Sequence, residues 1–95
     1  MLELTIGEQG EVIMSGRFDA SQAQKAEAFL SSVPSPEIID LAKLEYISSA
    51  GLGTLLQTQK RLLATGKKLI LINVSKHVRD IFHYSGFDQI FEIRG

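Results

Sequence analysis

The sequence predicts a single α/β domain over residues 1–95, with helices packed on a mixed, mostly parallel β-sheet that begins with an N-terminal β-hairpin. Three observations support this fold class. The length of 95 residues suits one compact domain and is too short for two. Apolar residues recur with the two-residue period of strands in some segments and with the helical period in others. These segments follow one another in the order β-β-α-β-α-β-α-β, which is typical of parallel strands joined by helices.

The first third of the chain predicts a hairpin followed by a helix. Leu2–Ile6 alternates apolar and polar residues, and Glu11–Met14 resumes an apolar strand after a four-residue turn that contains glycine. Residues 16–18 are expected to form a connector. Asp19 and Gln22 have the spacing of a capping box, in which each side chain satisfies a backbone N–H group at the start of a helix. The helix should end at the two prolines that follow it.

The rest of the chain predicts three strands that alternate with two helices. Residues 37–41 are expected to form a short strand, and residues 52–63 carry leucines at helical spacing. Residues 69–72 are apolar without alternation, which is typical of a central strand covered on both faces. Ser75 is expected to cap the third helix, and residues 90–93 should form the last short strand.

Composition and charge argue against several classes of protein. Cysteine is absent, so no disulfide framework or thiolate metal site is possible, and a reducing cytoplasm is the expected location. No apolar run approaches the roughly 20 residues that span a bilayer, and the amino terminus lacks the features of a signal peptide. The net charge of −1 argues against a nucleic-acid binder, although no acid lies between Glu45 and Asp80. The bases from Lys60 to Arg79 have no aromatic residue among them, so we interpret them as solvated helix ends and a turn.

The residue patterns of enzymes and of metal or cofactor sites are poorly matched. His77 and His83 lie six positions apart and do not form the i, i+4 pair that holds a metal ion on one helix face. Gly51 and Gly53 begin a glycine pattern, but Leu56 occupies the third glycine position of a dinucleotide-binding loop. We therefore expect no catalysis, no cofactor and no metal.

Ser48 and Ser49 carry the strongest functional signal. They directly precede a helix whose first turn contains Gly51 and Gly53, and each glycine costs about 0.5–1 kcal/mol relative to alanine. One interpretation is structural: a serine caps the helix, and the glycines let it approach a strand. The other is functional: an exposed serine at the positive end of a helix can accept a phosphate, and small neighbours let another protein reach it.

These serines belong to a longer pattern. Residues 38–41 and Leu44, followed by residues 46–53, read apolar-Asp-Leu, a short gap, then aromatic-apolar-Ser-Ser-Ala-Gly-Leu-Gly. This pattern resembles the signature of the STAS domain family, specifically the bacterial anti-sigma factor antagonists. Residues 16–20 are similar to the family's Gly-Glu-Leu-Asp segment, and residues 78–86 to its last helix. Together these segments extend the resemblance, and with it a single STAS domain, over nearly the whole chain.

The resemblance implies functional roles for particular residues. The serine that the family phosphorylates falls on Ser49, and Ser48 stands where many members have aspartate. Asp40 matches the aspartate that closes the third strand and is expected to support the site. For Asp40 and Asp19, a local hydrogen bond in a cap or loop is an equally good interpretation. The implied switch loop and partner-binding surface consists of Arg17, Asp19, Ser48, Ala50, Gly51, Leu52, Gly53 and Thr54.

The function that the resemblance implies is partner switching. In the family, the unphosphorylated protein binds an anti-sigma factor that is also a GHKL-type serine kinase, and thereby releases a sigma factor. Phosphorylation ends the binding, and a serine phosphatase is expected as a second partner, whereas nucleic acid and membrane are not. The alternative is a STAS module that binds a small ligand or serves as a structural subunit of a transporter or signalling complex, with Ser49 only a helix cap.

Overall fold

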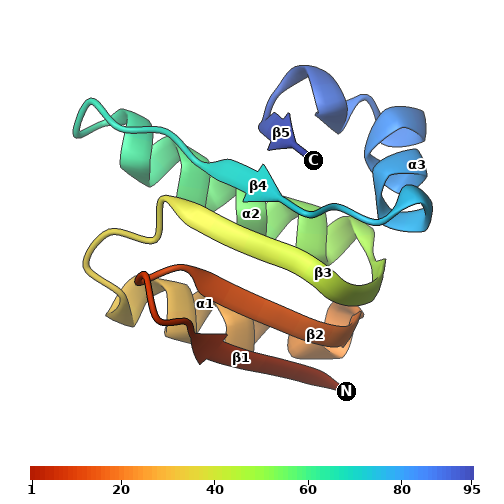
Figure 1. The fold of residues 1–95 in the computed structure, drawn as a ribbon, viewed down its shortest axis with the longest axis horizontal. Coiled ribbons are helices and arrows are strands. Elements are labelled where there is room, and N and C mark those ends of the chain that lie inside the picture. Colours follow the sequence, from red (N-terminus) through yellow and green to blue (C-terminus); the bar gives the residue numbers. More distant parts are fainter.

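Strands and helices follow one another as predicted in the computed structural model, which describes residues 1–95 (Figure 1). The strands are β1 (Leu2–Ile6), β2 (Val12–Phe18), β3 (Ile38–Ile47), β4 (Ile70–Ile72) and β5 (Glu92–Arg94). The helices are α1 (Ala23–Ser32), α2 (Ser49–Leu63) and α3 (Lys76–Ser85), with short 3₁₀ turns at Ala20–Gln22 and Phe87–Gln89. None of the helices is long and apolar enough to cross a membrane.

The five strands lie side by side in sequence order, β1-β2-β3-β4-β5 (Figure 1). β1 and β2 form the predicted antiparallel hairpin, and the other neighbouring pairs are parallel. Each helical crossover therefore leads to the next strand in the same direction along the sheet. Because such crossovers are right-handed, they place the helices on one face of the sheet, and α1 and α2 lie behind it in Figure 1.

The prediction that residues 69–72 are covered on both faces is wrong. Leu69 and Leu71 are fully buried, whereas Ile70 and Ile72 are only half-buried on the face that has no helices. The alternation continues in β3, where Ile39 is buried but Ile38 is 40% exposed. The partly exposed residues are isoleucines, and β-branched side chains suit the open face of a sheet as well as its core, so an apolar run that contains them does not distinguish the two arrangements.

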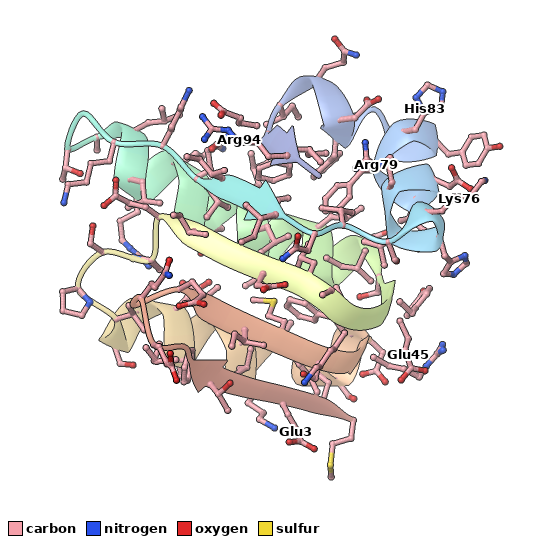
Figure 2. The ribbon with its side chains drawn as sticks, viewed as in Figure 1. Glu3, Glu45, Lys76, Arg79, His83 and Arg94 are labelled. Carbon is pink, nitrogen blue, oxygen red and sulfur yellow. The ribbon has the colours of Figure 1, made fainter.

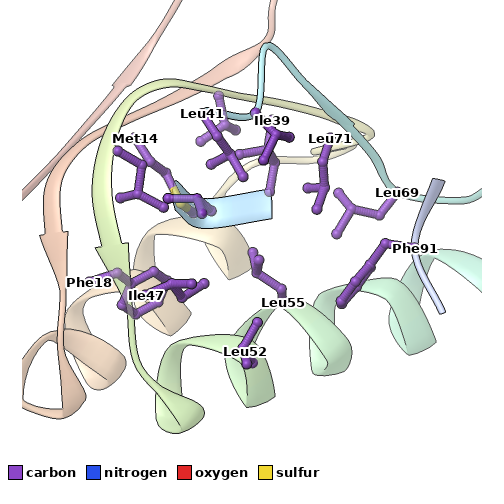
Figure 3. Close-up of a cluster of buried hydrophobic side chains, with 14 of the residues drawn as sticks. Met14, Phe18, Ile39, Leu41, Ile47, Leu52, Leu55, Leu69, Leu71 and Phe91 are labelled. Atoms are coloured by element: carbon purple, nitrogen blue, oxygen red, sulfur yellow. The ribbon is translucent and has the colours of Figure 1, made fainter. Parts of the chain in front are cut away.

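The core lies between the sheet and the helices and contains 19 buried apolar residues (Figure 3). Leu52 and Leu55 of α2 enter it opposite side chains from β2 and β3, among them Phe18 and Ile47. Burying one such leucine stabilises the fold by about 1.5–3 kcal/mol. The first turn of α2, which contains the predicted site, is thus held firmly against the ends of β2 and β3.

β2 continues to Phe18, so the predicted connector at residues 16–18 is part of a strand. Gly16 has φ +95°, a conformation that favours glycine, and a side chain there would overlap the carbonyl oxygen of Met1. The same carbonyl accepts a hydrogen bond of 3.0 Å from the N–H group of Arg17. The glycine therefore allows β1 to pair closely with β2 up to its first residue.

β3 is ten residues long, about twice the predicted strand at residues 37–41. Its register with β2 shifts at two places, and at each of them β3 has one more residue than β2. Such bulges interrupt the alternation of buried and exposed residues that marks a strand in the sequence. The extension brings Ile47 level with Phe18, so that α2 begins beside the end of β2.

Two polar side chains in the second half of α2 tie the helix to its surroundings. The buried Gln59 accepts a hydrogen bond from the N–H group of Leu69 at 3.1 Å and donates one to the carbonyl oxygen of Ile90 at 2.6 Å. Arg61 donates to the carbonyl oxygen of Leu30, near the end of α1, at 2.9 Å. Both residues hold the fold together at the end of α2 that lies away from Ser48 and Ser49.

Candidate functional site

Ser48 is the N-cap of α2. Its backbone is extended (φ −86°, ψ 171°), and its Oγ accepts a hydrogen bond from the N–H group of Gly51 at 3.1 Å. Its carbonyl oxygen accepts from the N–H group of Leu52 at 2.9 Å. Serine and aspartate cap helices about equally well. A serine at this position of the family pattern therefore removes a charge but keeps the cap.

Ser49, the first residue of α2, is exposed and has no part in the cap. Its hydroxyl forms no hydrogen bond within the protein, and its N–H group and that of Ala50 are also without a protein partner. Free N–H groups and aligned peptide dipoles favour negative charge at a helix start. Ser49 is therefore an accessible alcohol at a position that tolerates an anion.

The end of β2 holds this turn in place. The N–H group of Ser48 donates to the carbonyl oxygen of Phe18 at 2.8 Å. One residue earlier, the guanidinium of Arg17 lies 4.6 Å from the ring centroid of Tyr46, the residue opposite it in β3. Arg17 is exposed, and Tyr46 is half-buried. A cation stacked on an aromatic ring thus stands next to the turn that carries Ser49.

Asp19 follows Phe18 and lies beside the same turn, but its role is local. Its Oδ1 accepts hydrogen bonds from the hydroxyl of Ser21 at 2.6 Å and from the N–H group of Ser21 at 3.1 Å. The bond from the hydroxyl is the main cause that lowers the pKa of Asp19 below its usual 3.8. The predicted capping box is wrong, because Gln22 turns away and accepts from the N–H group of Leu2 at 3.1 Å. Asp19 instead caps the 3₁₀ turn that precedes α1.

The two glycines of the first helical turn have different environments. Gly51 is buried, and a Cβ atom there would lie 2.7 Å from Cγ1 of Ile47 and 3.0 Å from the ring of Phe18. It therefore allows the helix to approach the strands, which is the structural interpretation. A Cβ atom on Gly53 would meet nothing within 4 Å. The expectation that small residues keep the surface open is thus supported for Gly53 and the exposed Ala50, and is wrong for Gly51.

Two other residues of the predicted partner surface are buried. Leu52 is 4% exposed and belongs to the core, and Thr54 is 6% exposed. The hydroxyl of Thr54 donates to the carbonyl oxygen of Ala50 at 3.2 Å, one turn earlier in the helix. The exposed part of the predicted surface therefore consists of Arg17 and Ala50, with Ser48, Gly53 and Asp19 partly accessible, and the predicted phosphorylation site Ser49 is exposed beside them.

Two shallow grooves flank the start of α2. One lies between α1 and α2 and is lined by Ala23, Gln24, Glu27, Ala50, Gly53, Thr54 and Gln57. The other lies between the end of β3 and α3 and is lined by Tyr46, Ile47, Ser49, Leu52, Ile81, Tyr84 and Ser85. Sequence reasoning missed the two tyrosines. Tyr84 is 86% exposed. The feature of the sequence that could have indicated its role is that this large aromatic residue lies outside the apolar stripe of its helix.

Asp40 does not belong to this site. It was expected to close the third strand, but it lies near the beginning of β3, seven residues before Ile47, or about 23 Å along a strand. Its two carboxylate oxygens accept from the N–H group of Ala42 at 2.9 Å and from the side-chain amide of Asn73 at 3.2 Å. It therefore stabilises the bulged part of β3 and the segment after β4.

The sequence and the fold both resemble known proteins. The family model described as the STAS domain matches residues 7–95. The chain is 37% identical over 84 residues to BtrV of Bordetella bronchiseptica, named as an anti-sigma factor antagonist, and the match covers 84% of this chain and 72% of BtrV.

Two solved structures have the same fold. An anti-sigma factor antagonist from Mycobacterium paratuberculosis superposes with a TM-score of 0.80 at 24% identity, over 99% of this chain and 84% of that one. The phosphorylated form of SpoIIAA, a cell fate determinant from Bacillus, superposes with a TM-score of 0.66 at 22% identity, over 98% of this chain and 90% of that one.

Proposed function

Since the chain belongs to the STAS domain family, we propose that it is an anti-sigma factor antagonist that acts by partner switching. In its unmodified form it binds an anti-sigma factor of the GHKL serine kinase type, and the sigma factor is released. Phosphorylation of Ser49 by that kinase ends the binding, and a serine phosphatase restores the unmodified form. The name of BtrV as an anti-sigma factor antagonist and the phosphorylated form of SpoIIAA support this proposal.

The observation that carries the proposal is the division of roles between the two serines. Ser48 caps α2 with its Oγ, so the hydroxyl of Ser49 is free for a reaction. A phosphate adds about −1.5 to −2 charges, and at the start of a helix it meets free N–H groups and the positive end of the dipole. The fold can therefore accept the modification without losing a hydrogen bond.

The position of Ser49 supports the proposal that a phosphate there ends binding. Ser49 lines the groove between β3 and α3, and the next residue, Ala50, lines the groove between α1 and α2. A partner that covers the start of α2 must therefore remove water from Ser49. Placing a phosphate dianion in such an interface without a counter-charge costs several kcal/mol, and about 1.4 kcal/mol already weakens binding tenfold. In this account the chain supplies a phosphoryl acceptor and a docking surface and catalyses no reaction.

The test is to incubate the protein with ATP and candidate GHKL-type kinases from the same genome and to locate the phosphate by mass spectrometry. We expect one phosphate, on Ser49. The Ser49→Ala variant should remain unmodified, and the matched variant Ser48→Ala should still be phosphorylated, because only the cap is lost. A phosphate on Ser48, or recovery of a never-phosphorylated chain bound to a membrane complex, would favour the alternative STAS module.

A further inference from the structure

Arg17 is an exposed cation that forms no ion pair within the protein, although its charge is the smallest of the causes that lower the pKa of Asp19. Its guanidinium stacks on Tyr46 at 4.6 Å from the ring centroid. No carboxylate of the protein forms an ion pair with it, and the same holds for Arg79, whereas the other two arginines, Arg61 and Arg94, have acidic partners. An arginine held on an aromatic ring keeps its planar N–H donors in a fixed direction, available to a carboxylate or a phosphate.

Pairing of the strands places Arg17 at the switch. It lies opposite Tyr46 in the parallel pair β2–β3, and the next residue, Phe18, accepts the hydrogen bond from Ser48. Tyr46 in turn lines the same groove as Ser49. Tyr46 therefore connects the two residues, because its ring carries the guanidinium of Arg17 and its side chain lines the groove that Ser49 also lines.

Arg17 is the exposed arginine near Ser49, and the other charged residues in this region have different surroundings. The carboxylate of Asp19 accepts two hydrogen bonds from Ser21. Glu45 lies near the end of β3 (Figure 2). On α3, Lys76 is paired with Asp80 at 3.0 Å, and the exposed His77 is its neighbour in sequence. Arg79 also lies on α3, away from the Glu45 edge in Figure 2, and so provides a matched control.

We propose, on the basis of the function proposed above, that Arg17 is the residue that receives an acidic group beside Ser49. In the unmodified protein this group is a carboxylate of the anti-sigma factor, and after modification it is the phosphate of Ser49 itself. Arginine binds either anion through two parallel N–H bonds, but one guanidinium cannot serve both. Phosphorylation then does two things: it adds negative charge to the docking surface and withdraws the cation that the partner binds.

The first test needs no partner. Phosphoserine is incorporated at position 49 by genetic code expansion, and its second ionisation is followed by ³¹P NMR in otherwise wild-type protein, in Arg17→Gln and in Arg79→Gln. A nearby guanidinium favours the dianion, so Arg17→Gln should raise this pKa by about half a unit, as expected for an exposed ion pair. Arg79→Gln should leave it unchanged. Equal phosphate titrations in the Arg17→Gln and wild-type proteins would overturn the proposal.

The second test measures affinity of the unmodified protein for the anti-sigma factor. Arg17→Gln should weaken binding about tenfold and reduce its dependence on salt, and Arg17→Lys should restore only part of the affinity. Circular dichroism checks that the variants are folded. Unchanged affinity of Arg17→Gln would refute the inference while leaving Ser49 switching intact. If the wild type binds no anti-sigma factor, the proposed function fails, and the phosphate titration still decides the role of Arg17.

Discussion

Alanine substitutions at the two glycines of the first turn of α2 should change stability in opposite directions. In a helix, alanine is favoured over glycine by about 0.8–1 kcal/mol. At Gly53 the new Cβ atom meets nothing within 4 Å, so Gly53→Ala should stabilise the fold by about 0.5–1 kcal/mol. At Gly51 the Cβ atom would lie 2.7 Å from Ile47 and 3.0 Å from Phe18, which are 1% and 0% exposed and have no room to move.

The cost at Gly51 exceeds the gain in helix propensity. Forcing an extra carbon into a packed core costs about 1–3 kcal/mol, so Gly51→Ala should be destabilised by about 0.5–2 kcal/mol in total. The difference between the two variants, about 1–3 kcal/mol, is large enough to measure by urea unfolding.

Urea unfolding should be followed by circular dichroism, because the chain has no tryptophan. The dependence of unfolding free energy on urea should be the same in both variants. If Gly51→Ala proves as stable as Gly53→Ala, the close contact of α2 with the ends of β2 and β3 is refuted.

Three further predictions concern the cap of α2, the hydrogen bonds of Gln59 and the stability of the protein in acid. Ser48→Ala should lower the free energy of unfolding by about 1 kcal/mol, whereas Ser49→Ala should leave it within 0.5 kcal/mol of wild type; urea unfolding that showed the reverse order would mean that Ser49 is the cap. Gln59→Leu leaves the buried N–H group of Leu69 and the partly buried carbonyl oxygen of Ile90 without their partner and should cost about 1–3 kcal/mol, while the matched control Gln57→Leu, at an exposed position of the same helix, should cost less than 0.5 kcal/mol; equal unfolding midpoints would contradict this. Folding lowers the pKa of Asp19 below 3.8, so its stabilising effect is complete above that pH and is lost as the pH falls through the lowered value; Asp19→Asn should therefore show a smaller loss of stability on acidification than wild type, and an identical acid profile would argue against the bond to Ser21.

The order of elements could be predicted from periodicity, but the length of β3 could not. Its buried residues are Ile39, Leu41, Leu44 and Ile47, and their spacings of two, three and three do not match the period of a regular strand. The extra residues are accommodated by bulges opposite β2, which are a property of strand pairing and leave no local mark in the sequence. For the same reason Asp40 was assigned to the end of a strand that in fact continues past it.

The candidate site was predictable where its features are local. The position of Ser49 before a helix and the small residues after it follow from the sequence pattern. Which of the two adjacent serines forms the cap depends on where the strand ends, because serine suits an N-cap at either position. The approach of Tyr84 to Ser49 depends on the packing of α3 beside β3, and no spacing in the sequence indicates it.

The most direct test of partner switching is a binding titration of the anti-sigma factor with two forms of the protein, one unmodified and one carrying phosphoserine at position 49. We expect tight binding of the unmodified form and binding at least about a hundredfold weaker for the modified form. A hundredfold change corresponds to about 2.8 kcal/mol, which is within the cost of burying a phosphate in the interface. Both forms should have the same circular dichroism spectrum, because Ser48 keeps the cap in each. Equal affinities of the two folded forms would show that Ser49 is not the switch.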